Sequence, residues 1–261
     1  MSEERATRME LRGSALWITL NRPQARNALS ADLVAALLED LRAAQRDARA
    51  RVVVLTGAGS AFCAGADLKN RGDMGGEGRG NPFVEILRLV RHGEKPVIAA
   101  VNGHAFGGGL GLVAAADIAI AAEGAQMSFS EVRIGAVPAM ISVVVLPKLG
   151  PHQTMRLFLT GERFDARRAE GYGLVHRVVA AGELERAVEA EVHAIVQGGP
   201  NAVREAKQLI RTVERLPEDE AFAFAEKKIA ELFASEEAAE GMRAFAEKRP
   251  PRWAPRGPGG A

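Results

Sequence analysis

The sequence has one cysteine and no long apolar run. Cys63 has no partner for an internal disulfide, and so low a cysteine content is typical of a reducing compartment. No apolar run approaches the roughly 20 residues that a transmembrane helix requires. The first residues, Met1 to Arg5, contain two glutamates and lack the apolar stretch of a secretory signal. We therefore expect a cytoplasmic protein with no membrane partner.

The chain also lacks an excess of charge of either sign. Its 34 lysines and arginines nearly balance 33 aspartates and glutamates, for a net charge of +1. The basic residues are scattered rather than gathered in a stripe, which argues against a nucleic-acid partner. The five histidines show no metal-ligand spacing, so we expect no metal. A length of 261 residues suffices for one large domain or a domain with a helical appendage.

Short apolar runs and helical patterns alternate along much of the chain. Residues 52–56 and 97–101 are continuously apolar, which is typical of strands in a sheet buried on both faces. Ser30 can cap a helix whose apolar stripe runs from Leu33 to Leu41. A strand or a hairpin is predicted at 11–20, and further strands at 117–121 and 174–179. Further helices are predicted at 83–90, 107–116, 140–149, 153–159, 182–197, 201–215 and 217–233. This order predicts an α/β core followed by an α-helical region.

Two glycine-rich loops follow the two apolar strands. They read FCAGADL at 62–68 and NGHAFGGG at 102–109, and we expect each to lead towards a helix. Glycine permits sharp turns and close approach of a ligand to the main chain. Backbone N–H groups at a helix start have no internal partner. Two such loops could direct two donors at one oxygen and stabilise an oxyanion, although they could also be simple strand-to-helix connections.

Five segments carry a resemblance to a known family. They read NRPQARNALS from 21, AFCAGADL from 61, KPVIAAVNGHAFGGGLGL from 95, SEVRIGAVP from 130 and SEEAAEGMRAFAEKRPPRW from 235. In this order and spacing they resemble the crotonase superfamily, the enoyl-CoA hydratase/isomerase group, over residues 10–253. The resemblance implies a spiral of ββα units over 1–195 and a C-terminal α-helical trimerisation region over 196–253. It also implies a homo-oligomer, either a trimer or a hexamer of two trimers. We expect residues 254–261 to be a loosely ordered tail.

The resemblance also implies where the chemistry takes place. The backbone amides of Ala66 and Gly108 would stabilise the thioester enolate of a bound acyl-CoA, and one such donor is worth roughly 10²–10³ in rate. Hydratases of the family use two glutamates, and the corresponding positions here hold Gly111 and Glu131. Glu131 is therefore the predicted acid/base, with a pKa raised by an apolar pocket. The alternative is an exposed glutamate paired with Arg133.

One glutamate leaves three functions open: hydration, transfer of a proton between the α- and γ-carbons by an isomerase, and acyl-CoA binding without catalysis. The segments GGGLGLVAAADIAIA and FSEVRIGAVPAMIS resemble bacterial methylglutaconyl-CoA hydratases of leucine catabolism, which favours hydration. Because that substrate carries a distal carboxylate, we expect a cationic partner. The candidates by position are Lys69, Arg71, Arg79 and Arg133.

The resemblance further implies the contacts with CoA, which is part of the substrate, so no separate cofactor is expected. Residues 64–68 would line the adenine and pantetheine path, namely Ala64, Ala66, Asp67 and Leu68. Arg26 would lie near the nucleotide phosphates, and Phe245 and Lys248 would reach the nucleotide of a neighbouring subunit.

Two other signals are weaker. GLGLVA at 109–114 matches a dinucleotide-binding pattern, but the required acid at the end of the next strand is missing. Cys63 has no neighbouring base in the sequence, so we expect a buried thiol rather than a nucleophile.

Overall fold

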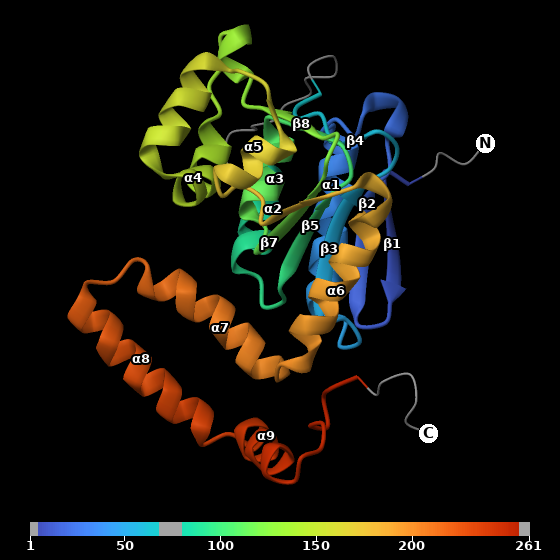
Figure 1. The fold of residues 1–261 in the computed structure, drawn as a ribbon. Coiled ribbons are helices and arrows are strands. Elements are labelled where there is room, and N and C mark those ends of the chain that lie inside the picture. Colours follow the sequence, from blue (N-terminus) through green and yellow to red (C-terminus); the bar gives the residue numbers. More distant parts are fainter. Residues whose placement is uncertain (1–4, 68–79, 256–261) are drawn as a thin grey trace.

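The computed structural model describes residues 5–67 and 80–255. Figure 1 shows a mixed α/β body, with the C-terminal helices lying beneath it. The elements in chain order are β1 (Thr7–Arg12), β2 (Ala15–Leu20), η1 (Pro23–Ala25), α1 (Ala31–Arg46), β3 (Val52–Gly57), β4 (Ala61–Cys63), α2 (Pro82–His92), β5 (Val97–Val101), β6 (His104–Phe106), α3 (Gly108–Ala115), β7 (Ile118–Ala122), β8 (Gln126–Ser128), η2 (Glu131–Ile134), α4 (Ala139–Thr160), β9 (Phe164–Asp165), α5 (Ala166–Gly171), β10 (Arg177–Val179), η3 (Ala181–Glu183), α6 (Leu184–Gln197), α7 (Pro200–Val213), α8 (Glu218–Phe233) and α9 (Glu236–Ala246).

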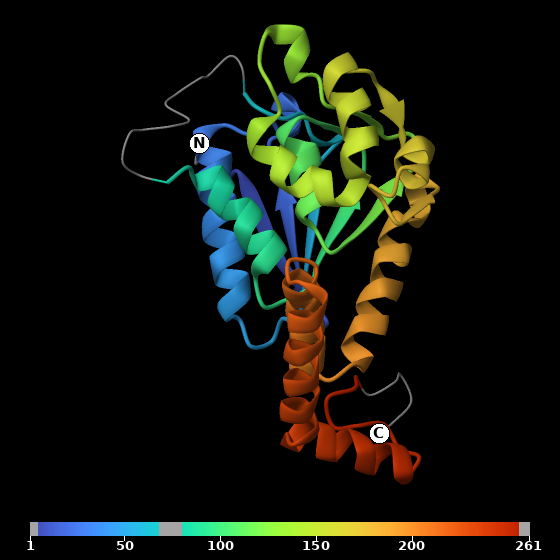
Figure 2. The same cartoon turned by 90° about the vertical axis from the view of Figure 1, so that its left-hand side faces the viewer.

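The larger sheet has six strands in the order β1-β2-β3-β5-β7-β10. The hairpin β1–β2 is antiparallel, and the other neighbours are parallel. Alternate residues of β3 enter two different cores, since Val53 and Leu55 pack with α1 and α2 while Val52 and Val54 pack with α6. In Figure 2 the sheet stands between α1 and α2 on one side and α6 on the other. The prediction of a sheet buried on both faces is confirmed.

Local signals in the sequence place most of the helices correctly. The Ser30 hydroxyl accepts a hydrogen bond from the Leu33 amide and caps α1, as predicted. The two helices predicted between 140 and 159 form α4, which breaks at Gly150, where φ is 68° and ψ is 167°. The helix predicted at 107–116 is α3.

The second sheet was not predicted from the sequence. It has four strands in the order β4-β6-β8-β9, and β4, β6 and β8 are only three residues long. A run of three residues carries too little alternation to be recognised as a strand. Because β4 pairs in parallel with β6, and β6 with β8, the segments that follow these strands emerge side by side. This small sheet therefore brings both glycine-rich loops and Glu131 to one place.

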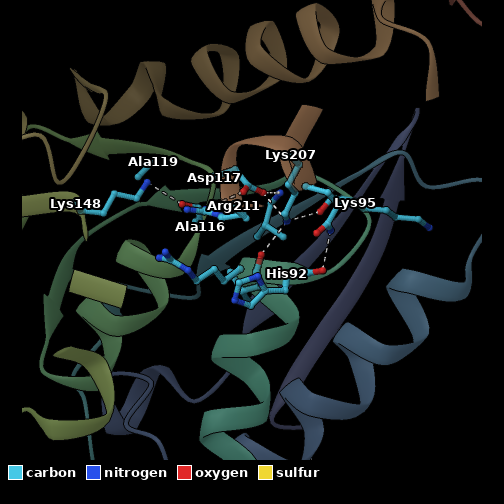
Figure 3. Close-up of polar contacts among 12 residues, drawn as sticks. His92, Lys95, Ala116, Asp117, Ala119, Lys148, Lys207 and Arg211 are labelled. Carbon is cyan, nitrogen blue, oxygen red and sulfur yellow. Dashed lines mark hydrogen bonds and ion pairs between the residues drawn. The ribbon is translucent and has the colours of Figure 1, made fainter. Parts of the chain in front are cut away.

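Helix α7 is attached to the core by a buried ion network, shown in Figure 3. The Lys207 ammonium lies 2.8 Å from Asp117 Oδ2 and donates to the carbonyl oxygens of Val90 and Lys95, each at 2.9 Å. Arg211 lies 3.3 Å from the other carboxylate oxygen of Asp117. Since the Lys207 side chain is 5% exposed, these contacts are shielded from water. They fix α7 against the end of the sheet at which the internal strand β7 begins, since Asp117 directly precedes that strand.

We expect Lys207→Met to lower the free energy of unfolding by about 3 kcal/mol, because it leaves two largely buried carbonyls without their donor and removes one of the two cations that pair with Asp117. Urea denaturation monitored by circular dichroism measures this change. The matched control is Lys227→Met, since the Lys227 ammonium lies 4.0 Å from Glu231 and is 79% exposed. That exposed pair is worth less than about 1 kcal/mol. Equal losses in the two variants would contradict a structural role for the network.

Helices α8 and α9 project away from the sheets (Figure 2). No residue of α8 is buried, and Phe222, Ile229 and Phe233 expose more than half of their surface. Helix α4 also exposes Val143, Met155 and Leu159. Within the described part of the chain, no helix is both long and apolar enough to span a bilayer.

Candidate active site

The two glycine-rich loops touch each other. Gly65 has φ +84°, and a Cβ placed on it would lie 2.8 Å from the Phe106 oxygen and 3.5 Å from the Gly108 nitrogen. A Cβ on Gly109 would lie 2.4 Å from the Cys63 oxygen. Real Cβ atoms essentially never lie this close to an oxygen atom, so both positions require glycine. The absence of side chains lets the main chains of the loops meet.

The N–H of Ala66 is directed away from its neighbouring segment. Ala66 forms a parallel bridge with Leu29, in which Leu29 donates to the Gly65 oxygen at 2.8 Å and Asp67 donates to the Leu29 oxygen at 3.4 Å. In such a bridge the flanking residues make both hydrogen bonds, so the amide of the central residue points outward. Within the described residues, this amide donates to no backbone carbonyl.

The second amide is that of Gly108, the first residue of α3. The first N–H groups of a helix have no partner within it, and Gly108 donates to no backbone carbonyl in the described segments. The preceding residue, Gly107, has φ 48° and ψ −118° and donates its own N–H to Ser128 at 3.0 Å. Ala66 and Gly108 both line one cavity of about 260 Å³. The arrangement can present two donors to one oxygen of a bound molecule.

Glu131 lines the same cavity. It opens η2, directly after β8 and Ser130. A Cβ on Gly107 would lie 2.9 Å from Glu131 Oε1, so this carboxylate lies beside the loop that carries the Gly108 amide. Glu131 Oε2 is buried and has no hydrogen-bond partner among the described residues. Burial raises the pKa of Glu131, which favours a group that can both accept and donate a proton.

The alternative of a Glu131–Arg133 surface pair is wrong. Arg133 Nε donates to the Gly161 carbonyl at 2.9 Å, and Nη2 donates to the Thr160 carbonyl at 3.1 Å. Thr160 is the last residue of α4 and Gly161 is its C-cap, so the guanidinium connects η2 to the end of that helix. Glu131 is left without a counter-ion in the described part of the chain.

The position of the first family glutamate is closed by an apolar side chain. A Cβ on Gly111 would lie 2.3 Å from Cγ2 of Ile141. Ile141 is 3% exposed and belongs to the cavity wall, together with Leu29, Val34 and Phe83. No side chain can leave Gly111 towards the cavity unless Ile141 moves. The place of a second carboxylate is therefore filled by hydrocarbon.

The remaining predicted contact residues fall into four groups. Ala64 lines the cavity, and its amide donates to the Arg26 carbonyl at 3.0 Å, although the Arg26 side chain is exposed. Asp67 lies 3.5 Å from Arg22 in an ion pair. Phe245 on α9 is 88% exposed, and the exposed Lys248 follows that helix with φ 53°. Neither belongs to the cavity wall of its own chain. Leu68, Lys69, Arg71 and Arg79 lie outside the described residues.

Sequence reasoning missed the side chains that shape the cavity, namely Phe83, Phe106, Met140 and Ile141. Apolar residues at helical spacing look the same whether they enter a core or a binding site, so no signal separates them.

The prediction of a buried thiol is confirmed, since burial raises the pKa of Cys63 to about 12 and leaves it unreactive. No cluster of potential metal ligands occurs within the described segments.

Comparison with known proteins identifies the family to which this geometry belongs. The family described as Enoyl-CoA hydratase/isomerase matches residues 10–256. The chain belongs to the enoyl-CoA hydratase/isomerase family. It is 38% identical over 253 residues to Enoyl-CoA hydratase EchA19 of Mycobacterium tuberculosis, covering 94% of this chain and 95% of that protein. It is also 38% identical over 253 residues to Carnitinyl-CoA dehydratase of Escherichia coli K12, covering 92% and 95%.

Solved structures agree with this assignment. Pseudomonas aeruginosa AtuE aligns with a TM-score of 0.90 and 36% identity, over 96% of this chain and 100% of that one. An enoyl-CoA hydratase from Shewanella pealeana aligns with a TM-score of 0.88 and 30% identity, over 95% and 96%. The crotonase-like fold expected from the sequence is confirmed. Membership of the enoyl-CoA hydratase/isomerase family supports an enoyl-CoA hydratase-type enzyme that acts on acyl-CoA thioesters.

Proposed function

We propose that this enzyme reversibly hydrates a branched 2-enoyl-CoA, namely 3-methylglutaconyl-CoA, to 3-hydroxy-3-methylglutaryl-CoA. The observation that carries the proposal is that Glu131, with its buried Oε2, is the one acidic residue among the described residues of the cavity wall, while Ile141 stands in the place of a second carboxylate. The segments around Gly111 and Glu131, which resemble methylglutaconyl-CoA hydratases, add support for the acyl group. The dehydratase among the relatives agrees with chemistry that adds or removes water.

In the proposed reaction, the thioester oxygen accepts hydrogen bonds from the Ala66 and Gly108 amides. Glu131 takes a proton from water as the water oxygen bonds to the β-carbon, and the electrons of the double bond pass to the thioester as an enolate. The protonated Glu131 then gives its proton to the α-carbon, which restores the carboxylate and the thioester carbonyl. A carboxyl group with a raised pKa can serve in both steps. Each donor to the enolate oxygen contributes roughly 10²–10³ in rate.

An assay with two substrates tests the acyl group. We expect purified protein to hydrate 3-methylglutaconyl-CoA with a higher kcat/KM than crotonyl-CoA, because Ile141 replaces the second carboxylate used by general hydratases. A preference for crotonyl-CoA would rule out the branched substrate while leaving enoyl-CoA hydration in place. Isomerisation is the competing reaction, since one carboxylate can also move a proton between the α- and γ-carbons. Incorporation of ¹⁸O from labelled water at the β-carbon separates hydration from isomerisation.

The same proposal includes a homo-oligomer, a trimer or a hexamer of two trimers, in the cytoplasm. Its support is the exposed apolar surface of α4 and α8, which a second copy would cover. Phe245 and Lys248 would then contribute to the CoA site of a neighbouring subunit, as the resemblance implies. No cofactor beyond the CoA of the substrate is required.

A further inference from the structure

A second cavity adjoins the reaction cavity. Its volume is about 440 Å³, and it shares Ala64, Phe106 and Ser130 with the reaction cavity. The charged side chains that line the second cavity are those of Arg133 and Arg163. Ser130 directly precedes Glu131, so the second cavity opens beside the proposed acid/base.

The two arginines of this cavity carry positive charge and form no ion pair within the part of the chain that the structure describes. Arg133 is held by carbonyl oxygens, which orient its guanidinium without neutralising it. The Arg163 guanidinium lies over the ring of Phe106, 5.5 Å from its centroid. Within the described residues, neither arginine forms an ion pair with a carboxylate. The adjacent acid, Glu162, instead pairs with Arg156 and Arg168, each at 2.8 Å.

The wall of the reaction cavity holds no lysine or arginine among the described residues, and it includes the buried apolar side chains of Leu29, Val34, Phe83 and Ile141. A carboxylate placed there would lose water without gaining a cation, which is strongly unfavourable. The second cavity offers two guanidinium groups instead, and guanidinium groups bind carboxylates through paired hydrogen bonds. The phosphates of CoA are a poorer match, because the pantetheine arm separates them from the thioester that Ala66 and Gly108 would hold.

We infer that the second cavity is the subsite for the distal carboxylate of the acyl group, with Arg163 as a specificity-determining residue and Arg133 as its partner. This inference rests on the proposed hydration of a dicarboxylic enoyl-CoA. It assigns the acyl carboxylate to the side of Ser130 and Phe106, and the apolar branch of the acyl group to the side of Phe83 and Ile141.

The experiment compares Arg163→Met with wild type on 3-methylglutaconyl-CoA and crotonyl-CoA. We expect the ratio of the two kcat/KM values to fall about 10- to 100-fold, because a charge-assisted hydrogen bond is lost only with the dicarboxylic substrate. Arg163→Lys should lose less, since it keeps the charge. The matched control is Arg46→Met on α1, an exposed arginine outside both cavities, which should leave the ratio as in wild type. Near-native circular dichroism confirms that the variants are folded.

A third substrate distinguishes the carboxylate from the CoA phosphates. 3-Methylglutaconyl-pantetheine lacks the nucleotide and its phosphates, and the loss in Arg163→Met should persist with it. A loss shared equally by both CoA thioesters that vanishes with the pantetheine thioester would assign Arg163 to the CoA phosphates and overturn the inference. An unchanged ratio would also overturn it. If wild type itself prefers crotonyl-CoA, the proposed substrate is wrong, and this result is independent of the variant.

Discussion

Glu131→Gln is expected to lower kcat by about 10²–10⁴ while CoA affinity stays nearly unchanged. Glutamine has almost the same shape as glutamate but cannot exchange a proton with water or with the α-carbon. The Ala66 and Gly108 amides remain in place, so binding of the thioester is preserved. Steady-state kinetics with 3-methylglutaconyl-CoA and titration with CoA measure the two quantities separately. A rate within tenfold of wild type would exclude Glu131 as the acid/base.

The matched control is Glu123→Gln, which neutralises an exposed carboxylate paired with Arg167. This variant should keep the wild-type rate. If the protein binds acyl-CoA without catalysis, neither wild type nor the Glu131→Gln and Glu123→Gln variants should show an enzymatic rate. It would be supported if wild type bound acyl-CoA but produced no hydration or isomerisation above the uncatalysed reaction.

Stability gives an independent measurement on the same variant. Because burial raises the pKa of Glu131, the native state binds this proton more tightly than the unfolded chain does. The ionised group therefore destabilises the fold increasingly as the pH rises through its ordinary pKa towards the raised value. Glutamine removes that penalty, so Glu131→Gln should melt at a higher temperature than wild type above this range. The difference should disappear at pH values below the ordinary glutamate pKa.

The sequence predicted the larger sheet well because its signals are local. Val52 to Leu55 is continuously apolar, and Ser30 precedes an apolar helical stripe, so each element is recognisable on its own. The smaller sheet depends instead on pairing between strands of three residues, whose stability comes from neighbours distant in the sequence. That sheet sets the relative position of the two loops and of Glu131. The resemblance thus implied that these residues meet in one site, but the small sheet that brings them together could not be predicted.

The cavity wall illustrates the same limit. The sequence shows that Gly111 stands where a glutamate is usual, but it does not show that Ile141 occupies the space. Arg163 belongs to no recognisable sequence motif. Its proposed role follows only from its position over the Phe106 ring and in the same cavity as Arg133. The position of Ile141 against Gly111 and that of Arg163 against Phe106 both depend on packing between segments that are 30 to 57 residues apart in the sequence.

Gly107→Ala is expected to lower kcat/KM at least 10²-fold. The Gly108 N–H belongs to the peptide that follows Gly107, so the backbone angles of Gly107 (φ 48°, ψ −118°) set its direction. A residue with a Cβ is strained there by about 1–3 kcal/mol, and relaxation of that strain turns the donor away from the cavity. The new Cβ would also lie 2.9 Å from Glu131 Oε1 and displace the carboxylate. Loss of one oxyanion donor alone costs roughly 10²–10³ in rate.

Gly13→Ala is the matched control for strain. Gly13 has φ +57° but no atom within 4 Å of the added Cβ, so this variant should lose some stability and no activity. The double variant Gly107→Ala/Glu131→Gln separates the two effects of the methyl group. If Gly107 acts through the Gly108 amide, the residual rate of Glu131→Gln should fall again by about 10²-fold or more. If the methyl group acts only by moving the carboxylate, it should cause no further loss in that background. We expect the further loss, because the peptide of Gly108 must turn whichever side chain stands at 131.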